Sequence, residues 1–199
     1  ICENIQIQRE KITLGELDCI ILKEEKPIHL EIIYKFYLYD ASVGETEIHH
    51  LIGPNRKDSL VEKLRKLKEK QLPLLYSKEC SEYLKSINLN VNKVTQQVYF
   101  KGQLFIPFSN NNIQLSVLNQ DAICGFYIHQ NELSHFKDCA FYIPSKKDWI
   151  ITPHKNVSWI NFEDFKGISK EYLAREFSPL CWMKKPNGET KKFFFVWWT

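Results

Sequence analysis

The sequence predicts an α+β fold, or the related α/β class, in a single domain that spans residues 1–199. Three stretches rich in β-branched and aromatic residues, at 4–8, 15–24 and 28–39, predict three consecutive strands. An amphipathic stretch at 58–75 then predicts a helix, and short apolar segments after residue 91 predict a β-rich remainder. The predicted order is therefore β-β-β-α-(α)-β, followed by further strands.

The amphipathic segment carries the signals of a helix and of its end. Leu60, Leu64, Leu67 and Gln71 recur at helical spacing and share one face, and Pro73 predicts where the helix stops. Further predicted elements are a short helix at 77–87, a partly helical segment at 161–177, and a terminal hairpin that turns at Asn187-Gly188.

Composition and charge narrow the class of protein. Hydrophobic residues make up 44% of the 199 residues and aromatic residues 14%, which indicates a globular chain with a sizeable core. No apolar run reaches the roughly 18 to 20 residues that a membrane helix needs. The net charge of +3 permits a nucleic-acid partner without arguing for one. Six widely spaced cysteines without a C-x-x-C pattern are typical of reduced thiols in a cytoplasmic protein.

Charged residues interrupt the second and third predicted strands. Residues two apart in a strand share one face, so Glu16 and Asp18 are expected to point the same way, as are His29, Glu31 and Lys35. One patch of the sheet would then carry three carboxylates, an ammonium group and an imidazole.

The register of this hairpin depends on where its tip lies. A tip at 25–26 places Asp18 opposite Ile33 and Glu16 opposite Lys35, with Glu31 as a diagonal neighbour of Asp18. The other face of the two strands is apolar and is expected to pack on helices. That face comprises Leu17, Cys19, Ile21, Leu30, Ile32, Tyr34, Phe36 and Leu38.

Two interpretations of the acidic patch remain open. Neighbouring carboxylates repel one another unless a positive group lies between them, and Mg²⁺, which prefers oxygen ligands, is a common solution. Such a metal activates water and stabilises charge on a phosphate, while a lysine positions the nucleophile, so the patch predicts phosphodiester hydrolysis. The alternative is a surface ladder of ion pairs, such as Glu16 with Lys35, which would contribute only about 0–1 kcal/mol to stability.

Four blocks of sequence resemble a known family: LGELD, HLEIIYKFYL, GPNRKDSLVEKLRKLKEKQLPL and KGQLFIPF. The chain resembles an uncharacterised bacterial family, domain of unknown function eighteen fifty-three, which is grouped with the PD-(D/E)xK nuclease-like superfamily. The resemblance implies an αβββαβ core over 1–107, with its first helix upstream of Ile1, and a β-rich C-terminal elaboration over 108–199. The start at Ile1, without Met or signal-peptide features, predicts a fragment.

The resemblance also assigns roles to residues. Gly15-Glu16-Leu17-Asp18 resembles the G-x-x-D element, which implies that Asp18 is a metal ligand, and Glu31 resembles the acidic residue of (D/E)xK. Ile33 stands where the superfamily has lysine, and Lys35 follows two positions later on the same face. The family pattern therefore leaves open a migrated catalytic lysine or a scaffold that has lost catalysis.

The predicted helix offers a basic stripe next to its apolar face. Lys63, Lys66 and Lys70 are expected to contact nucleic-acid phosphates, or else to form a solvated flank. Gln71 lies on the apolar side, where it either makes a buried hydrogen bond or reaches into the site.

The leading functional prediction is a metal-dependent nuclease. In this hypothesis Asp18 and Glu31 bind Mg²⁺ or Mn²⁺, Lys35 positions the attacking water, and Glu16 assists. The alternatives are a catalytically inactive nucleic-acid-binding module and a protein-interaction module on the same fold, the latter using the aromatic C-terminal region.

Overall fold

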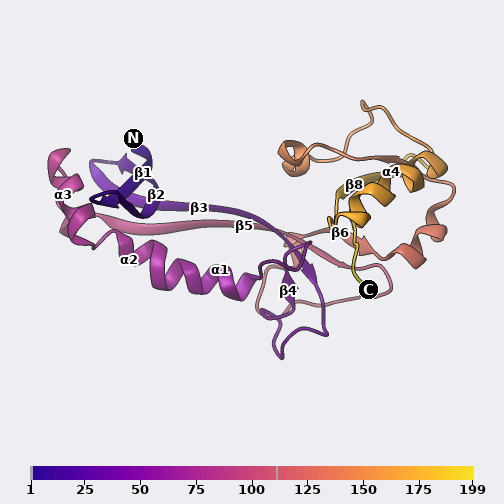
Figure 1. The fold of residues 1–199 in the computed structure, drawn as a ribbon, viewed down its shortest axis with the longest axis horizontal. Helices are drawn as coiled ribbons and strands as arrows, with labels where there is room; N and C mark the ends of the chain where they lie inside the picture. The colour runs from indigo at the N-terminus through magenta and orange to yellow at the C-terminus, as the bar shows by residue number, and fades with distance from the viewer. Residues whose placement is uncertain (1, 111) are drawn as a thin grey trace. The chain divides into compact units, whose positions relative to one another are not determined.

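The structure, a computed structural model, describes residues 2–110 and 112–199 and has a mixed α+β fold (Figure 1). Among these residues, nine strands form one mixed sheet in the order β1-β2-β3-β5-β6-β9-β8-β7, and β4 pairs with β3. The chain divides into two compact units that alternate along the sequence. Unit 1 comprises Ile1–Lys35 and Val61–Gly102, and unit 2 comprises Phe36–Leu60 and Gln103–Thr199.

Unit 1 contains a three-stranded meander followed by helices and a further strand. Its elements are β1 (Cys2–Arg9), β2 (Ile12–Lys23), the first part of β3 (Lys26–Tyr39), α1 (Leu60–Lys66), the π-helical segment η1 (Leu67–Gln71), α2 (Leu72–Leu74), α3 (Lys78–Ser86), the 3-10 turn η2 (Val91–Lys93) and the first part of β5 (Thr95–Pro107). The predicted order of three strands, two helices and a strand is confirmed here.

The tip of the β2–β3 hairpin lies one residue earlier than the sequence predicts. Lys23 pairs with Lys26, so Glu24 and Glu25 form the turn, with φ angles of 51° and 63°. Positive φ at both central residues matches the twist of a tight hairpin, which normally selects Gly or Asn at these positions. The predicted register, with Asp18 opposite Ile33, is therefore wrong, because the paired positions of β2 and β3 are shifted.

The burial of β3 is also opposite to the prediction. His29 and Glu31 are both 0% exposed and Ile33 is 4% exposed, whereas Ile32 is 52% exposed. The helices of unit 1 lie along the strand face that carries Glu31, since Gln71 contacts this side chain. The polar residues of β3 therefore point into the interior, and the predicted packing of Ile32 on helices is wrong.

The helical segment continues past the predicted end at Pro73. It runs from α1 through η1 to Leu74, and Pro73 lies in the first turn of α2. A proline has no backbone N–H to donate, and the wider π-helical turn before it is where the hydrogen-bond pattern changes. Leu60 and Leu67 are buried, but Leu64 is 37% exposed, so the predicted apolar face is only partly correct.

Unit 2 is a strand-rich unit with one longer helix. Its elements are β4 (Leu51–Ile52), η3 (Gln120–Ala122), β6 (Ile123–Ile128), η4 (Gln130–Phe136), β7 (Ala140–Tyr142), η5 (Lys146–Ile150), α4 (Phe162–Ala174), β8 (Leu180–Lys184) and β9 (Thr190–Phe195), together with the last parts of β3 and β5. β9 runs parallel to β6 and antiparallel to β8, so it is a central strand with a hydrogen-bonded neighbour on each edge. The predicted terminal hairpin is confirmed, with a loop at 185–189 in which Gly188 has φ +84°.

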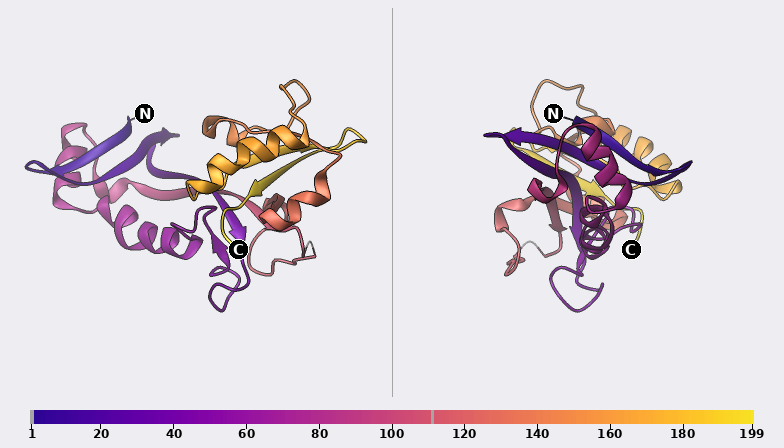
Figure 2. Two further views of the ribbon diagram at one scale, coloured as in Figure 1. Left: turned by 45° about the vertical axis from the view of Figure 1, so that its right-hand side comes forward. Right: turned by 90° about the vertical axis from the view of Figure 1, so that its left-hand side faces the viewer.

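Aromatic residues form most of the core of unit 2. Helix α4 lies along β8 and β9 (Figure 2), and its Phe165 stacks on Phe141 with ring centroids 4.3 Å apart. Phe193 and Phe195 of β9 belong to the same buried cluster. Most of the C-terminal aromatic side chains therefore pack against one another inside the unit, as expected from the usual role of such residues.

Two further predictions concern the chain as a whole. In the part of the chain that the structure describes, no helix has both the length and the apolar character to cross a membrane. The division into a core over 1–107 and an elaboration over 108–199 stays a prediction, because compactness alone does not decide which segments fold independently.

Candidate functional site

The candidate site lies in unit 1, where strands β2 and β3 separate. Their paired stretch runs from Lys23↔Lys26 to Cys19↔Leu30. Immediately beyond it, the Asp18 carboxylate accepts a hydrogen bond from the backbone N–H of Ile32, at 2.7 Å from Oδ2. Asp18 thus replaces a backbone acceptor at the fork between the strands, which fixes the position of its carboxylate.

The Glu31 carboxylate lies inside unit 1 and has a partner for each oxygen. The Nε2 atom of His29 is 2.9 Å from Oε1, and the amide Nε2 of Gln71 donates to Oε2 at 2.7 Å. Neither His29 nor Glu31 has an exposed side chain. A buried carboxylate is costly unless it is hydrogen-bonded, and these two contacts supply that stabilisation.

Lys63 reaches the same network through Gln71. The ammonium group of Lys63 donates to Oε1 of Gln71 at 2.7 Å, while the amide of Gln71 donates onward to Glu31. Gln71 is the last residue of the π-helical segment, whose extra residue per turn changes the direction in which the side chain points. Lys63 and Glu31 are therefore connected by a single amide that is polarised at both ends.

Gln96 of β5 completes the network on the far side of His29. Its amide nitrogen donates to the backbone oxygen of Leu72 at 2.7 Å and lies 3.0 Å from Nδ1 of His29. Because the amide nitrogen is a donor, Nδ1 of His29 accepts, and its Nε2 therefore donates to Glu31. The imidazole acts as a fixed hydrogen-bond bridge between β5 and Glu31.

Burial and neighbouring charges both affect the pKa of Lys63. Burial lowers the pKa of Lys63 below its ordinary value, and the charges of Lys66 and Lys35 lower it further. The carboxylates of Glu31 and Asp18 act in the opposite direction. Lys35 therefore lies within electrostatic range of the network.

A cleft of about 350 Å³ opens beside this network. Its lining includes two carboxylates, Glu16 and Asp18, and two ammonium groups, Lys66 and Lys70. The remaining lining residues are Leu14, Gly15, Gln71 and Leu74. A cleft with both signs of charge can hold a cation on the acidic side and a phosphate on the basic side.

The chemistry of this lining fits a hard divalent cation in part. Glu16 and Asp18 present oxygen ligands to the cleft, and Mg²⁺ and Mn²⁺ prefer oxygen. Glu31 does not line the cleft, and both of its oxygens accept hydrogen bonds from protein groups. Within residues 2–110 and 112–199, no group of three or more His, Cys, Asp and Glu side chains is arranged to bind a metal.

The structure brings most of the predicted site residues into one region of unit 1. Glu16, Asp18, Lys66, Lys70 and Gln71 line the cleft. Glu31 and Lys63 bond to Gln71, while Lys35 does not line the cleft and is related to the network only by the effect of its charge on the pKa of Lys63.

Two members of the network carry no predicted role, His29 and Gln96. His29 shares a strand face with Glu31, which is a signal in the sequence. Gln96 lies 67 positions from His29 and gives no such signal.

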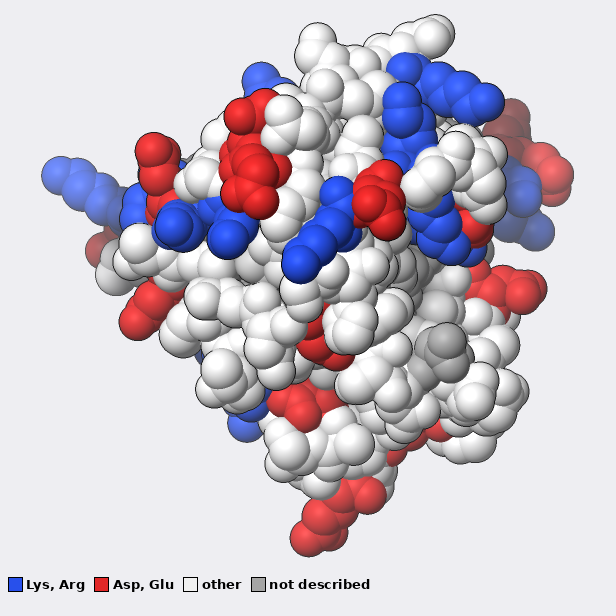
Figure 3. Space-filling view, turned by 90° about the vertical axis from the view of Figure 1, so that its right-hand side faces the viewer, with Lys and Arg blue, Asp and Glu red and all other residues white. Residues whose placement is uncertain are grey.

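Charges of both signs lie on one face of the molecule. Figure 3 shows one face of the molecule, on which Lys and Arg side chains lie next to Asp and Glu side chains. This pattern agrees with the small net charge of +3. Any affinity for a polyanion therefore depends on local groups such as those at the cleft rather than on the overall charge.

Comparisons with known proteins identify a family. No curated protein and no solved structure gives a significant match to the chain. The grouping with the PD-(D/E)xK superfamily and the bacterial origin stay predictions. A family model does match residues 1–196, and the chain therefore belongs to the family described as domain of unknown function (DUF1853).

Proposed function

We propose that unit 1 is a metal-dependent phosphodiesterase module that acts on nucleic acid at the cleft beside β2. The observation that carries this proposal is the lining of the cleft, which includes Glu16 and Asp18 as well as Lys66 and Lys70. The two carboxylates supply ligands for a divalent cation, and the two ammonium groups supply contacts for a phosphate.

Each residue has a separate task in this proposal. Asp18 and Glu16 hold Mg²⁺ or Mn²⁺, which when bound supplies a Lewis acid and a water of lowered pKa. Lys66 and Lys70 hold the phosphate backbone in the cleft. Glu31, which lies one hydrogen bond behind Gln71, joins the ligands if the amide moves aside. Lys35 remains the group proposed to position the attacking water.

The order of strands and helices in unit 1 supports the phosphodiesterase proposal. Strands β1, β2, β3 and β5 are neighbours in the sheet, and the helices α1–α3 lie in sequence between β3 and β5. This is the βββαβ order that the resemblance to PD-(D/E)xK proteins implies. The shared order of strands and helices supports the fold, and the residues that line the cleft support the proposed chemistry.

A second candidate function is nucleic-acid binding without hydrolysis. It is favoured by the environment of Glu31, which has no exposed side-chain surface and hydrogen-bonds through both oxygens. A carboxylate held in this way contributes to the stability of the network even without a metal. Binding would then depend on Lys66 and Lys70 in the cleft and on Lys63 beside it.

The substitution Asp18→Asn tests the hydrolase proposal with little structural disturbance. Asparagine keeps an oxygen that can accept from the N–H of Ile32 but removes the charge that a cation needs. We expect wild-type protein to bind Mn²⁺ in calorimetric titration and to cleave DNA or RNA, and the variant to lose both. Asp121→Asn, an exposed residue of unit 2, is the matched control and should keep both activities.

Lysine substitutions separate the two candidates. Replacing Lys66 and Lys70 together by Gln should weaken nucleic-acid binding and reduce the slope of log K against log salt by about 1.4 to 1.8. Lys68→Gln, on the same helical segment but outside the cleft, is the control. Salt-dependent binding that survives Asp18→Asn, without Mn²⁺ uptake or cleavage by wild type, would reject hydrolysis and support the binding module.

A further inference from the structure

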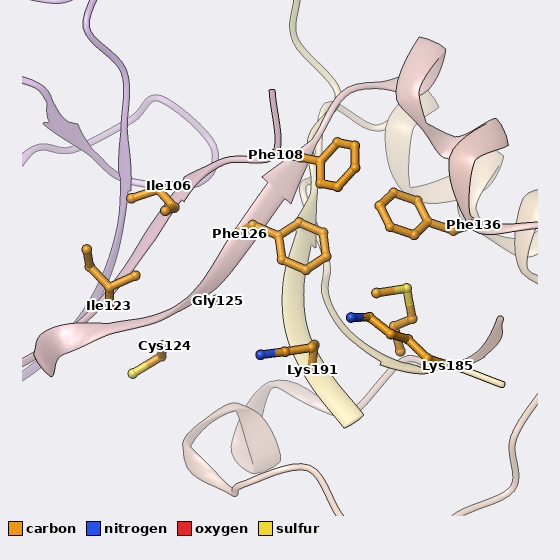
Figure 4. Close-up of a pocket in the computed structure, with 10 residues that line it drawn as sticks. Ile106, Phe108, Ile123, Cys124, Gly125, Phe126, Phe136, Lys185 and Lys191 are labelled. Carbon is orange, nitrogen blue, oxygen red and sulfur yellow. The ribbon is translucent and has the colours of Figure 1, made fainter. Parts of the chain in front are cut away.

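Unit 2 contains a separate cavity of about 400 Å³ with a largely apolar lining. Its walls come from the end of β5, from β6, from η4 and from the β8–β9 hairpin (Figure 4). Ile106, Phe108, Ile123, Phe126, Phe136 and Met183 form the apolar part. A volume of this size lies within the range of about 300–1,000 Å³ that is usual for small-molecule sites.

Two lysines form the polar part of the same cavity. Lys185 and Lys191 flank the loop between β8 and β9, and Figure 4 shows their side chains extending in the same direction near the ring of Phe126. Both ammonium groups contact Glu189, at 2.8 Å from Lys185 and 2.9 Å from Lys191. One carboxylate therefore serves two cations, and this group of three side chains keeps a charge of +1.

A third lysine, Lys192, follows Lys191 in β9 but does not line the cavity. Lys192 is 5% exposed, and its ammonium group donates to Oε1 of Gln103 and to the backbone oxygen of Trp149, both neutral acceptors. Burial lowers the pKa of Lys192, although its ammonium group keeps these two acceptors. Because Lys192 follows Lys191 in a strand, its side chain points to the opposite face of the sheet, and the charge at the cavity is that of Lys185, Lys191 and Glu189.

The aromatic rings in the wall argue against a stacked nucleobase. Phe126 lies nearly parallel to two other rings of the protein, Phe136 at an interplanar angle of 21° and Phe193 at 14°. Phe108 meets Phe126 and Phe136 at tilted or edge-on angles. The stacking positions beside Phe126 are therefore taken by protein rings, and the cavity offers ring edges and aliphatic groups.

We infer that this cavity binds an amphipathic monocarboxylate with an aliphatic chain, of which octanoate is a suitable probe. The chain packs between Ile123, Phe108 and Phe126, and the carboxylate pairs with Lys185 and Lys191 alongside Glu189. A single negative charge on the ligand matches the charge of +1 left by the three side chains. This site is independent of the cleft in unit 1.

Calorimetric titration of the full chain with sodium octanoate tests this inference. We expect saturable binding that is at least tenfold weaker for 1-octanol, which has the same chain but no charge. Lys191→Met should weaken octanoate binding about five- to tenfold. Glu189→Gln should tighten it several-fold, because both lysines are then available to the ligand. Lys170→Met, at an exposed position on α4, is the matched control and should have no effect.

Lys191→Met and Glu189→Gln together distinguish an effect of charge from a disturbance of the β8–β9 hairpin. A structural effect would weaken binding in both variants, whereas the charge argument predicts opposite directions. The inference is overturned if octanol binds as well as octanoate, if both variants shift in the same direction, or if adenosine monophosphate displaces octanoate and binds more tightly.

Cys124 supplies a second readout because it is exposed at the cavity. Saturating octanoate should slow the alkylation of Cys124 by iodoacetamide, as measured by peptide mass spectrometry. Cys2, half-buried in unit 1, serves as the internal reference and should react at an unchanged rate. Equal alkylation of Cys124 with and without octanoate would place the ligand elsewhere and overturn the assignment.

Discussion

Gln71 and Glu31 are forty positions apart in the sequence and are joined by a 2.7 Å hydrogen bond from amide to carboxylate. The amide oxygen of Gln71 accepts a hydrogen bond from the ammonium group of Lys63. The contact connects the helical segment of unit 1 to the middle of β3. Gln71 also lines the cleft, whereas Glu31, to which it donates, does not.

Removal of the Gln71 amide should destabilise unit 1. Gln71→Leu leaves one oxygen of a buried carboxylate without its donor, which costs about 1–3 kcal/mol. We expect that loss in the free energy of unfolding measured with urea. Gln97→Leu, an exposed position of β5, is the control and should change stability by less than about 0.5 kcal/mol. An unchanged midpoint for Gln71→Leu would mean that Glu31 obtains another donor.

The pKa of Lys63 should respond in opposite directions to two substitutions. Burial lowers this pKa, with further lowering by Lys66 and Lys35, while Glu31 and Asp18 raise it. Lys66→Gln should therefore raise the pKa of Lys63, and Asp18→Asn should lower it. The side-chain ¹³Cε resonance of Lys63, followed by NMR as pH is raised, measures both shifts.

The lowered pKa of Lys63 also makes the stability of the folded protein depend on pH. A lysine whose folded-state pKa is lowered penalises folding while it is charged, so stability rises with pH between that lowered value and the ordinary 10.5. Lys68→Gln should leave the titration of Lys63 unchanged. Shifts of equal sign for Lys66→Gln and Asp18→Asn would show that Lys63 does not lie among these charges.

Glu47 should control the order of the segment at 116–118. Its carboxylate accepts hydrogen bonds from the backbone N–H groups of Ser116, Val117 and Leu118 and from the Ser116 hydroxyl. Burial raises the pKa of Glu47, but these hydrogen bonds outweigh it and hold the pKa below 4.5. The stabilisation is therefore complete above pH 4.5 and is lost as pH falls through the lowered value.

Amide hydrogen exchange measures how strongly Glu47 stabilises the segment at 116–118. Glu47→Gln should accelerate exchange at Ser116, Val117 and Leu118, because a neutral amide oxygen accepts more weakly than a carboxylate. Glu45→Gln, two residues away and exposed, should have no effect. Equal protection in the two variants would show that other contacts hold the segment.

Two glycines of unit 2 should respond oppositely to alanine. A Cβ at Gly125 would lie 2.2 Å from the backbone oxygen of Lys192, which the strand pairing of β6 and β9 fixes. Gly125→Ala should therefore cost more than about 3 kcal/mol. A Cβ at Gly167 meets nothing within 4 Å, so Gly167→Ala in α4 should stabilise by about 0.5–1 kcal/mol. Thermal unfolding of both variants measures these two effects. A change of stability in the same direction for both variants would contradict the prediction.

The sequence predicts the elements of unit 1 more reliably than their relative register. Alternation along each strand is a local property, so the meander and the helices that follow it could be predicted. The hairpin tip is different, because Glu24 and Glu25 adopt positive φ although neither is Gly or Asn. The residue types indicate a turn here but do not distinguish a tip at 24–25 from one at 25–26, and this difference of one residue changes the predicted partner of Asp18.

The composition of the site could be predicted better than its burial. Glu16, Asp18, Glu31 and Lys35 stand out in the sequence because charges within strands need an explanation, and Lys63, Lys66 and Lys70 stand out as a basic stripe on a helix. The interior position of Glu31 depends on Gln71 and Gln96, which come from distant parts of the chain. Single-sequence periodicity cannot show such contacts, so the apolar face of β3 was assigned to the wrong side.

The alternation of the two units along the chain has a consequence for synthesis on the ribosome. The polypeptide passes from one unit to the other after Lys35, after Leu60 and after Gly102. Residues 36–60 emerge early, but their partners in unit 2 emerge only after residue 103 has been translated. These residues therefore cannot complete their packing while unit 1 is being synthesised, and a premature stop soon after residue 103 would leave them without most of the residues with which they pack.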